Sequence, residues 1–301
     1  MARTATTDGR GRSVDRSAVT ALVPVVVIVP FWLLALAVVW FAVRPLVDVA
    51  FWLLPVGWLT LGLLLFVPVV QVAVLSPALG ARRPLPHEAD RIEPAWREVT
   101  ERAGLRRHGY SVRVIDAPDL NAFACGGHLL IVTSFALEHL TPRQLAGVLA
   151  HELSHHLGLH TAALTVGHWL SLPVVALARI GFSFQNVARA ATDSFASSST
   201  LLTIVGRLVA LLLRIASWVF LAALITSDAL ANLVGRASEF EADQRVVRLG
   251  YGRHLAEALR VVIELGGGGR AIGWRARLAA SHPPARTRVA RIEASLRRPV
   301  R

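Results

Sequence analysis

The sequence TPRQLAGVLAHELSH, residues 141–155, decides how the rest of the chain is interpreted. Thr141 is a helix-capping residue, Pro142 suits the first helical position, and Gln144 stands where a capping box needs its second partner. Apolar residues follow at helical spacing. The stretch therefore predicts a helix that begins at Thr141 and carries His151.

This predicted helix has the spacing of a zinc-binding motif. His151 and His155 are four residues apart, so both imidazoles lie on one face and can bind a single Zn²⁺. Glu152 lies beside them and can act as general base toward a water activated by the metal. A catalytic zinc usually has three protein ligands and one open position. A third ligand is therefore needed from elsewhere in the chain.

The third ligand is predicted far downstream. The metzincin pattern would need a histidine at Thr161, and His160 falls one residue short, so we interpret His156 and His160 as helix-surface or interfacial histidines. Glu239 and Asp243 lie four apart, on one face of a predicted helix. We expect Glu239 to bind zinc and Asp243 to accept the ring N–H of a ligand histidine. The alternative is an acidic helix face paired with neighbouring arginines.

Two apolar stretches precede the motif. Hydrophobic residues make up 54% of the 301 positions, more than in an ordinary soluble domain. No charged residue occurs in 17–43 or in 49–81, and each stretch is long enough to cross about 30 Å of hydrocarbon. They predict two transmembrane helices. A cleaved signal peptide is the alternative for the first, but the apolar part is too long for one.

A second apolar pair, residues 161–226, follows the motif. Arg207 and Arg214 interrupt it, and a charge inside a bilayer is costly. The two arginines are seven residues apart and share a helical face. A spanning hairpin is expected, and a hairpin embedded in the membrane or packed on the soluble domain is the alternative.

The distribution of arginine indicates how the chain is oriented. The formal net charge is +12, and arginines gather before the first apolar stretch and after the second. The positive-inside rule then places both flanks, and the active site, on the cytoplasmic side of the cell (inner) membrane. The basic residues lack the aromatic interleaving of a nucleic-acid reader, so no nucleic-acid partner is expected. Cys125 is the single cysteine, so an intrachain disulfide is excluded.

These features predict a mainly α membrane protein. Its two N-terminal transmembrane helices precede a zincin-like α+β metalloprotease domain, which a second apolar hairpin interrupts. Period-two alternation and a Gly-Gly turn predict short strands at 111–116, 121–125 and 129–133. The expected segments are a basic cytoplasmic N-terminus (1–16), the first transmembrane hairpin (17–81) and the first part of the protease domain (82–160). The second apolar hairpin (161–226) and the second part of the protease domain (227–301) follow.

The chain resembles the HtpX-type integral membrane metalloproteases, gluzincins related to the CAAX prenyl endopeptidases. Matching segments occur in order, and these are the first hairpin, Asn121-Ala122-Phe123 with Gly126-Gly127, Thr141-Pro142, His151 to His155, the second apolar pair, Glu239 to Asp243, and Ser281-His282-Pro283-Pro284 with Arg288. The resemblance implies one Zn²⁺ per chain, with the two motif histidines and Glu239 as ligands, Glu152 as base and Asp243 as the partner that orients a ligand histidine.

The same resemblance assigns residues that local patterns do not. It implies that His282 and Arg288 approach the site and stabilise the oxyanion. It also implies that Asn121, Ala122 and Phe123 form an edge strand along which an extended substrate pairs its main chain. By the pattern alone this segment is an ordinary strand of a sheet.

The function expected from the sequence is a membrane-anchored, zinc-dependent endopeptidase that cleaves membrane or membrane-proximal proteins in protein quality control. Its partners would be a protein or peptide substrate and the lipid bilayer, and its oligomeric state stays open. One alternative is a sensor or antirepressor that cleaves a dedicated regulator. Others are a non-catalytic zinc-binding scaffold and a site-two protease, although the latter would carry its motif within a membrane span.

Overall fold

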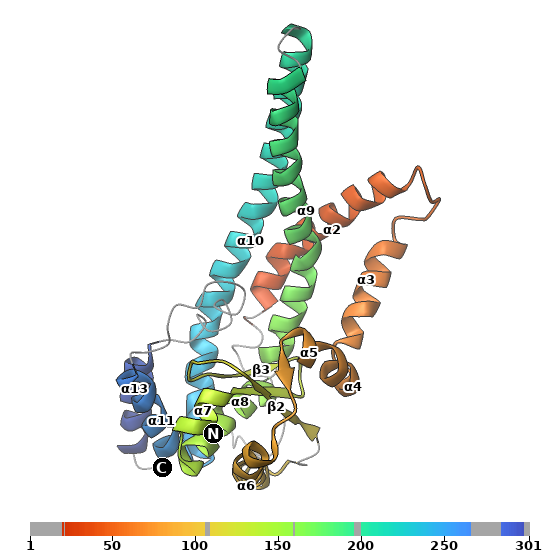
Figure 1. Cartoon of the computed structure of the whole chain (residues 1–301). Coiled ribbons are helices and arrows are strands. Elements are labelled where there is room, and N and C mark those ends of the chain that lie inside the picture. Colours follow the sequence, from red (N-terminus) through yellow and green to blue (C-terminus); the bar gives the residue numbers. More distant parts are fainter. Residues whose placement is uncertain are drawn as a thin grey trace, which may run out of the picture. The chain divides into compact units, whose positions relative to one another are not determined.

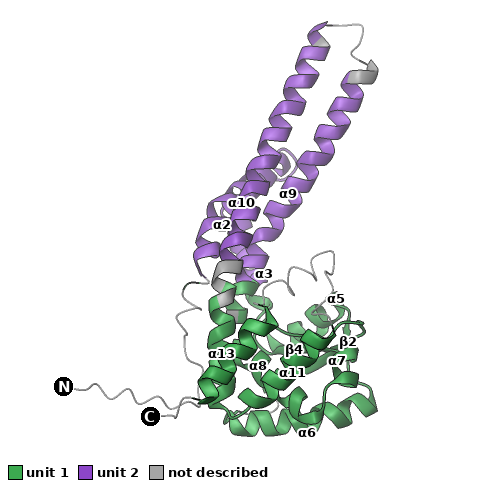
Figure 2. Cartoon of the chain, turned by 90° about the vertical axis from the view of Figure 1, so that its left-hand side faces the viewer, with its two compact units in different colours: residues 1–21, 63–165, 232–301 green, residues 22–62, 166–231 purple. Residues whose placement is uncertain are grey.

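The computed structural model describes residues 20, 22–105, 109–158, 160–195, 200–265 and 284–297. The chain forms two compact units (Figure 2). Unit 1 comprises residues 1–21, 63–165 and 232–301, and unit 2 comprises residues 22–62 and 166–231. Each unit thus combines segments that are far apart in the sequence.

Unit 2 is built from helices (Figure 1). They are α2 (Leu22–Val43), most of α3 (Leu53–Leu64), and long parts of α9 (His160–Phe195) and α10 (Thr200–Arg248). Trp32 of α2, Val174 of α9 and Phe220 of α10 belong to one buried apolar cluster. Trp58 and Trp169 stack with ring centroids 4.6 Å apart, and each indole N–H donates to the backbone carbonyl of the other residue. These contacts tie α3 to α9.

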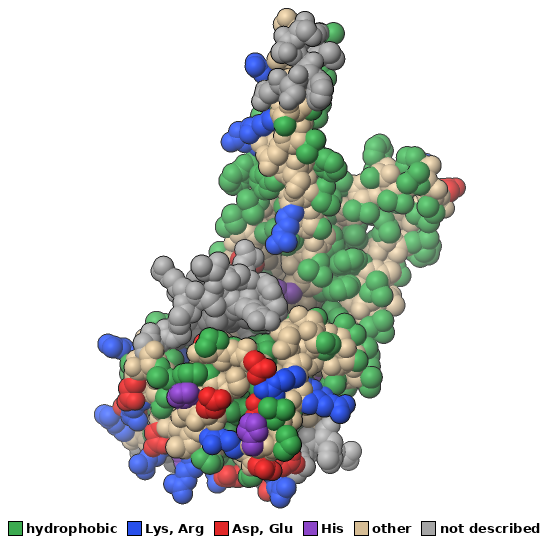
Figure 3. Space-filling model, viewed as in Figure 1, with side chains coloured by type: hydrophobic (Ala, Val, Ile, Leu, Met, Phe, Trp, Pro, Cys, Tyr) green, Lys and Arg blue, Asp and Glu red, His purple; other side chains and the backbone are tan. Residues whose placement is uncertain are grey.

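Three helical segments of the described chain are long and apolar enough to cross a membrane, and they are Leu22–Val43, Thr161–Thr192 and Thr203–Ala231. Figure 3 shows hydrophobic side chains over much of the surface of these helices. The predicted mainly α, membrane-type fold class is confirmed.

The second apolar stretch differs from the single span that the sequence suggested. It divides into α3, α4 (Pro68–Val70), a π-helical turn η1 (Gln71–Leu75) and α5 (Ser76–Ala78), and the pair Leu53–Leu64 and Pro68–Ala78 is bent by 80°. Proline lacks a backbone N–H, so Pro68 cannot continue the hydrogen bonding of α3. The pair could count as a fourth, broken span or as a re-entrant loop.

Unit 1 contains a four-stranded sheet with the order β1-β2-β4-β3. The strands are β1 (Ala81–Arg82), β2 (Ser111–Ile115), β3 (Ala122–Cys125) and β4 (Leu129–Thr133). The β2–β4 pair is parallel, whereas β1–β2 and β3–β4 are antiparallel. Every residue of β4 is buried, and β3 forms an edge of the sheet. The three strands predicted from the sequence are confirmed to within one residue at each end.

Helix α8 (Pro142–Leu157) packs against α6 (Pro86–Arg102) and α11 (Gly252–Glu264). Helix α13 (Ala285–Arg297) packs on α11, and α7 (Ser134–His139) contacts α6 and β4. Leu145, Leu149 and Leu153 of α8 are fully buried in the main apolar cluster. The expected start of α8 is confirmed, because Thr141 is the N-cap and forms a capping box with Gln144.

Helix α10 is longer than the sequence suggested. The sequence predicts a boundary between the second hairpin and the second protease part at residue 227, but α10 runs without a break from Thr200 to Arg248. No glycine or proline occurs between Gly206 and Gly235, so nothing in that stretch ends the helix. Glu239 is therefore carried on the same helix as the second apolar span.

Candidate metal centre

Helix α8 places the motif residues inside unit 1. The exposed fractions of His151, Glu152 and His155 are 2%, 3% and 8%. The capping box supports the start of this helix, since the Thr141 backbone N–H donates to Gln144 Oε1 at 2.8 Å. Ionisable side chains are seldom buried unless they are paired or bind a metal. Buried His151, Glu152 and His155 are therefore expected to have charged partners or to bind a metal.

The C-terminal part of α10 supplies an acidic partner. Glu239 is buried, and its Oε2 lies 3.2 Å from His151 Nε2, while its Oε1 lies 3.2 Å from His155 Nε2. The two Nε2 atoms are themselves 3.2 Å apart. Ligand atoms of His151, His155 and Glu239 thus lie within 4.8 Å of one another, although Glu239 is far downstream of the two histidines in the sequence.

These distances suit a zinc ion. Ligand bonds of about 2.0–2.2 Å in a tetrahedral site place the ligand atoms about 3.3–3.6 Å from one another. The two Nε2 atoms are 3.2 Å apart, and each is 3.2 Å from one of the two Glu239 oxygens, which is close to that value. Two imidazoles and one carboxylate are also a ligand set that leaves a fourth position open for catalysis. The His151, His155 and Glu239 side chains therefore fit zinc.

Asp243 lies one turn beyond Glu239 and contacts the other nitrogen of the same ring. Its Oδ1 lies 3.1 Å from His151 Nδ1. A carboxylate at Nδ1 favours the tautomer that carries its proton there, which leaves the Nε2 lone pair directed at the metal position. The geometry thus suits the orienting role predicted for Asp243.

Arg288 of α13 completes the buried charge cluster. Its Nε and Nη2 donate to the two Asp243 oxygens at 3.0 and 2.7 Å, and its Nη1 lies 3.3 Å from Glu239 Oε2. Its Nη2 also lies 3.0 Å from His151 Nε2. One guanidinium therefore contacts a predicted ligand histidine, Glu239 and Asp243.

The pKa shifts follow from this arrangement. Burial alone would raise the pKa of Asp243, but the charge of Arg288 and the contact with His151 outweigh it and hold this pKa at about 2. Burial and Arg288 act to lower the pKa of His151, whereas Glu239 and Asp243 raise it, to about 9 overall. The acidic surroundings therefore favour a cation at the ring, whether a proton or a metal ion.

His156 was placed wrongly by sequence reasoning. It was interpreted as a helix-surface or interfacial residue, but its exposed fraction is 2%. Its Nε2 lies 3.1 Å from the Leu129 carbonyl oxygen, and its Nδ1 lies 3.1 Å from Thr161 Oγ1. Because β4 and the start of α9 cover this side of α8, the ring is an interior link between elements. The side chain of His160 lies outside the described residues.

Other predicted residues have defined positions. Asn121 directly precedes β3, and its backbone oxygen accepts from the Thr133 N–H at 3.0 Å. Ala122 and Phe123 lie in β3, the edge strand, which contacts α8. The structure thus brings the predicted substrate strand next to the motif helix. His282 lies outside the described residues.

Gln71 is a residue that sequence reasoning missed. It is fully buried, its Nε2 donates to the Leu65 carbonyl at 2.9 Å, and its Oε1 accepts from the His128 N–H at 3.0 Å. It therefore holds η1 to the turn that joins β3 and β4. The available signal was a lone amide inside the uncharged stretch 49–81, where an unpaired polar group would be costly.

A family model described as Peptidase family M48 matches residues 86–296, more than half of the chain. The chain belongs to peptidase family M48. Members of the M48 family are zinc metalloproteases, so the ligand fit described above agrees with the family. The resemblance to HtpX-type proteases stated from the sequence is confirmed.

Two further relatives are consistent with membership of the M48 family. The chain is 31% identical to Protease HtpX from Nitrosococcus oceani over 193 residues, which cover 61% of this chain and 64% of that protein. Its fold is similar to the crystal structure of S. mikatae Ste24p, with a TM-score of 0.51, 16% identity, and coverage of 85% of this chain and 61% of that one. The chain thus spans less than two thirds of the length of either relative.

Proposed function

We propose that this M48-family protein is a membrane-bound, zinc-dependent endopeptidase. The observation that carries the proposal is the buried convergence of His151, His155 and Glu239, with Glu152 next to the first ligand on α8. The name of the HtpX relative, a protease, supports the same activity. The spacing of the ligand atoms supports one zinc ion per chain.

Each residue of the site has a proposed part. His151, His155 and Glu239 hold the metal, and zinc so bound supplies Lewis-acid catalysis and a water of lowered pKa. Glu152 takes the proton of the attacking water and delivers it to the leaving amine. Asp243 keeps the His151 ring in place.

Arg288 and β3 have proposed roles toward the substrate. The Arg288 guanidinium, together with His282, stabilises the negative charge that develops on the carbonyl oxygen. The edge of β3 at Asn121, Ala122 and Phe123 pairs with the main chain of an extended substrate, and main-chain pairing is independent of side-chain identity. Such a protease would accept varied sequences that can become extended near α8.

The apolar helices support a membrane location and membrane-proximal substrates. Three described helices can span a bilayer. Arginine-rich flanks support an orientation in which the active site faces the cytoplasm of the inner membrane. Cleavage of membrane or membrane-proximal chains in protein quality control is the role that suits this placement and a sequence-tolerant edge strand.

The activity is tested with detergent-purified protein and casein as an unfolded substrate. Glu152→Gln keeps the side-chain shape but cannot act as base, so cleavage is expected to fall by about 100-fold or more. Glu138→Gln, an exposed change on α7, is the matched control and is expected to cleave like the wild type. Equal cleavage by wild type and Glu152→Gln would contradict the proposal, and zinc binding without cleavage by either would favour a non-catalytic scaffold or a dedicated-substrate protease.

A further inference from the structure

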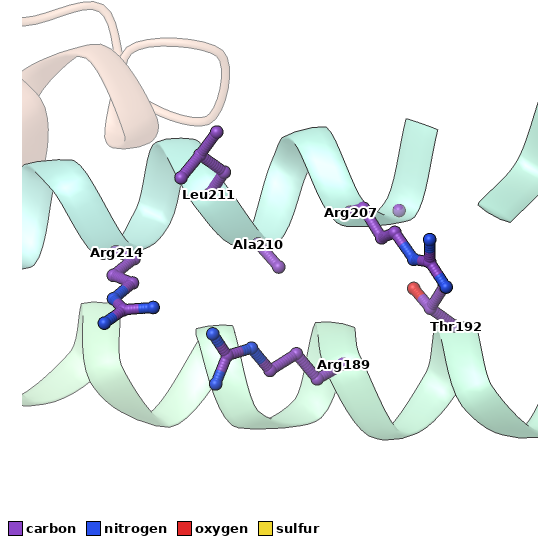
Figure 4. Close-up of a pocket in the computed structure, with 7 residues that line it drawn as sticks. Arg189, Thr192, Arg207, Ala210, Leu211 and Arg214 are labelled. Atoms are coloured by element: carbon purple, nitrogen blue, oxygen red, sulfur yellow. The ribbon is translucent and has the colours of Figure 1, made fainter. Parts of the chain in front are cut away.

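Helices α9 and α10 form a half-open cavity of about 390 Å³ within unit 2, and the arginine side chains that line it are exposed. Three arginines line it, Arg189 from α9 and Arg207 and Arg214 from α10 (Figure 4). All three belong to the helices that are apolar enough to cross a membrane. Neither the metal centre nor the substrate strand uses this cavity, so its arginines need a separate explanation.

The geometry of the two helices brings these charges together. Arg207 and Arg214 are seven residues apart, so they share one face of α10 and are separated by about 10.5 Å along its axis. Figure 4 shows Arg189 reaching from α9 into the space between them. Gly206 permits a close approach at one end of the cavity, because a Cβ at this position would collide with the Thr192 side chain. The cavity is therefore a built feature of the helix pair.

Within the described part of the chain, the positive charge of the cavity is not balanced by nearby acids. Among the residues that the structure describes, no carboxylate lies within ion-pair distance of these three guanidinium groups. A neutral side chain serves Arg189, since the Gln185 oxygen lies 3.1 and 3.2 Å from its Nη1 and Nη2 in the amide orientation that satisfies both residues. Like charges that line one cavity repel each other, and an anion bound among them removes that repulsion.

The three guanidinium groups that line the cavity favour phosphate as the bound anion. Guanidinium groups bind phosphate oxygens through paired, charge-assisted hydrogen bonds, and several of them can share one phosphate. The outer surface beside the cavity is apolar, because Leu208, Leu211 and Leu212 are 53%, 50% and 58% exposed. Acyl chains can lie against such a surface while a headgroup enters the cavity.

We propose that the Arg189–Arg207–Arg214 cavity binds a phosphate group, which the adjoining apolar surface favours as the phosphodiester of an anionic phospholipid. The site is independent of the metal centre. Binding would fix the α9–α10 hairpin to the lipid leaflet that surrounds the cavity. Free phosphate offers the same chemistry without acyl chains, so the two sources are distinguished by experiment.

The lipid source is tested by reconstituting the full chain into phosphatidylcholine bilayers that contain about one tenth phosphatidylglycerol. Lipids that remain bound after extraction are then quantified by mass spectrometry. The wild type is expected to retain phosphatidylglycerol as about half of its bound lipid, roughly five times its share of the bilayer. The triple change Arg189→Gln, Arg207→Gln and Arg214→Gln is expected to reduce retention to that share. Arg179→Gln removes a charge from α9 outside the cavity lining and should retain the lipid like the wild type.

The free-phosphate source is tested by titrating the detergent-solubilised chain with inorganic phosphate and following thermal unfolding. Stabilisation that requires the three arginines, without enrichment of phosphatidylglycerol, assigns the site to free phosphate. If the triple variant does not fold, Arg189→Lys keeps the charge but loses the paired geometry, and retention is then expected to fall about three-fold. The proposal is overturned if neither probe depends on the three arginines, or if Arg179→Gln has the same effect as the triple change.

Discussion

Asp243 Oδ1 lies 3.1 Å from Nδ1 of His151, the ring nitrogen that does not face the other predicted ligands. The opposite nitrogen, Nε2, lies 3.2 Å from a Glu239 oxygen. Glu239 and Asp243 are one helical turn apart on α10, so a single helix contacts both nitrogens of one imidazole. The Asp243 carboxylate is placed to orient the His151 ring, and the Glu239 carboxylate lies beside the ring at the predicted metal position.

This relationship predicts the effect of Asp243→Asn on metal binding. The amide is a weaker acceptor for the ring N–H and no longer raises the basicity of Nε2. Zinc affinity is expected to fall about 10- to 100-fold, measured by competition with a chelator of known affinity. Glu241→Gln on the same helix is the control and should bind like the wild type. An unchanged affinity in Asp243→Asn would show that this carboxylate does not act on the ring.

Arg288→Met tests the buried charge cluster that Arg288 of α13 forms with Glu239 and Asp243 of α10. The substitution removes the guanidinium that contacts Asp243 and Glu239, so two buried carboxylates lose their cation. We expect the zinc-free protein to lose about 3–5 kcal/mol of stability, and added zinc to restore part of it. Thermal unfolding with and without zinc measures both effects. The exposed Arg286→Met is the control, and equal unfolding temperatures for the two variants would contradict the assignment.

The packing of α8 on α11 predicts a strong effect at Gly147. A Cβ at this position would lie 2.6 Å from the Leu255 nitrogen and 2.8 Å from the His254 carbonyl carbon, both backbone atoms that cannot move alone. Gly147→Ala must therefore push α11 away from the motif helix, at a cost of about 1–3 kcal/mol. Gly57→Ala, with no atom within 4 Å of its new Cβ, is the control and should be neutral or stabilising. The same unfolding temperature for both variants would refute the close packing.

The ion pair between Arg82 and Glu88 predicts a dependence of stability on pH. Two hydrogen bonds from Arg82, at 2.6 and 2.8 Å, hold the pKa of the buried Glu88 carboxyl below its usual range. A lowered folded-state pKa stabilises the fold above the unfolded value of about 4.3, and this contribution is lost as the pH falls through the folded pKa.

Arg82→Gln is therefore expected to destabilise the protein by about 1–3 kcal/mol at neutral pH. The difference from the wild type should shrink below about pH 4, where Glu88 takes up a proton in the unfolded chain. The difference in the free energy of unfolding is measured at a series of pH values, with Arg83→Gln, a change at an exposed neighbouring residue, as control. A difference that stays constant across this range would exclude the ion pair as its cause.

Local rules explain which parts of the site were predictable. The start of α8 depends on Thr141 and Gln144, neighbours in sequence, and the pairing of His151 with His155 follows from helical periodicity. The pattern of Glu239 and Asp243 was visible for the same reason. That Glu239 contacts both histidines is a tertiary relationship that no local pattern contains, so it was reached by ligand counting and family resemblance.

Tertiary packing explains what was missed. His156 follows a predicted ligand on a helix, and its burial depends on β4 and on Thr161, which local periodicity does not place. The bend after α3 involves Pro68 and the buried Gln71, which uniform hydropathy over residues 49–81 conceals. The unbroken course of α10 was missed because a change in composition near residue 227 resembled a boundary.

Zinc held by His151, His155 and Glu239 is expected to support peptide hydrolysis with Glu152 as base. The most direct measurement is casein cleavage by metal-depleted protein during titration with zinc, with bound zinc determined in the same samples. The wild type is expected to bind about one zinc per chain and to regain cleavage in proportion, whereas Glu152→Gln should bind the same amount without cleaving. Cleavage that does not depend on zinc, or equal cleavage by Glu152→Gln, would contradict the claim.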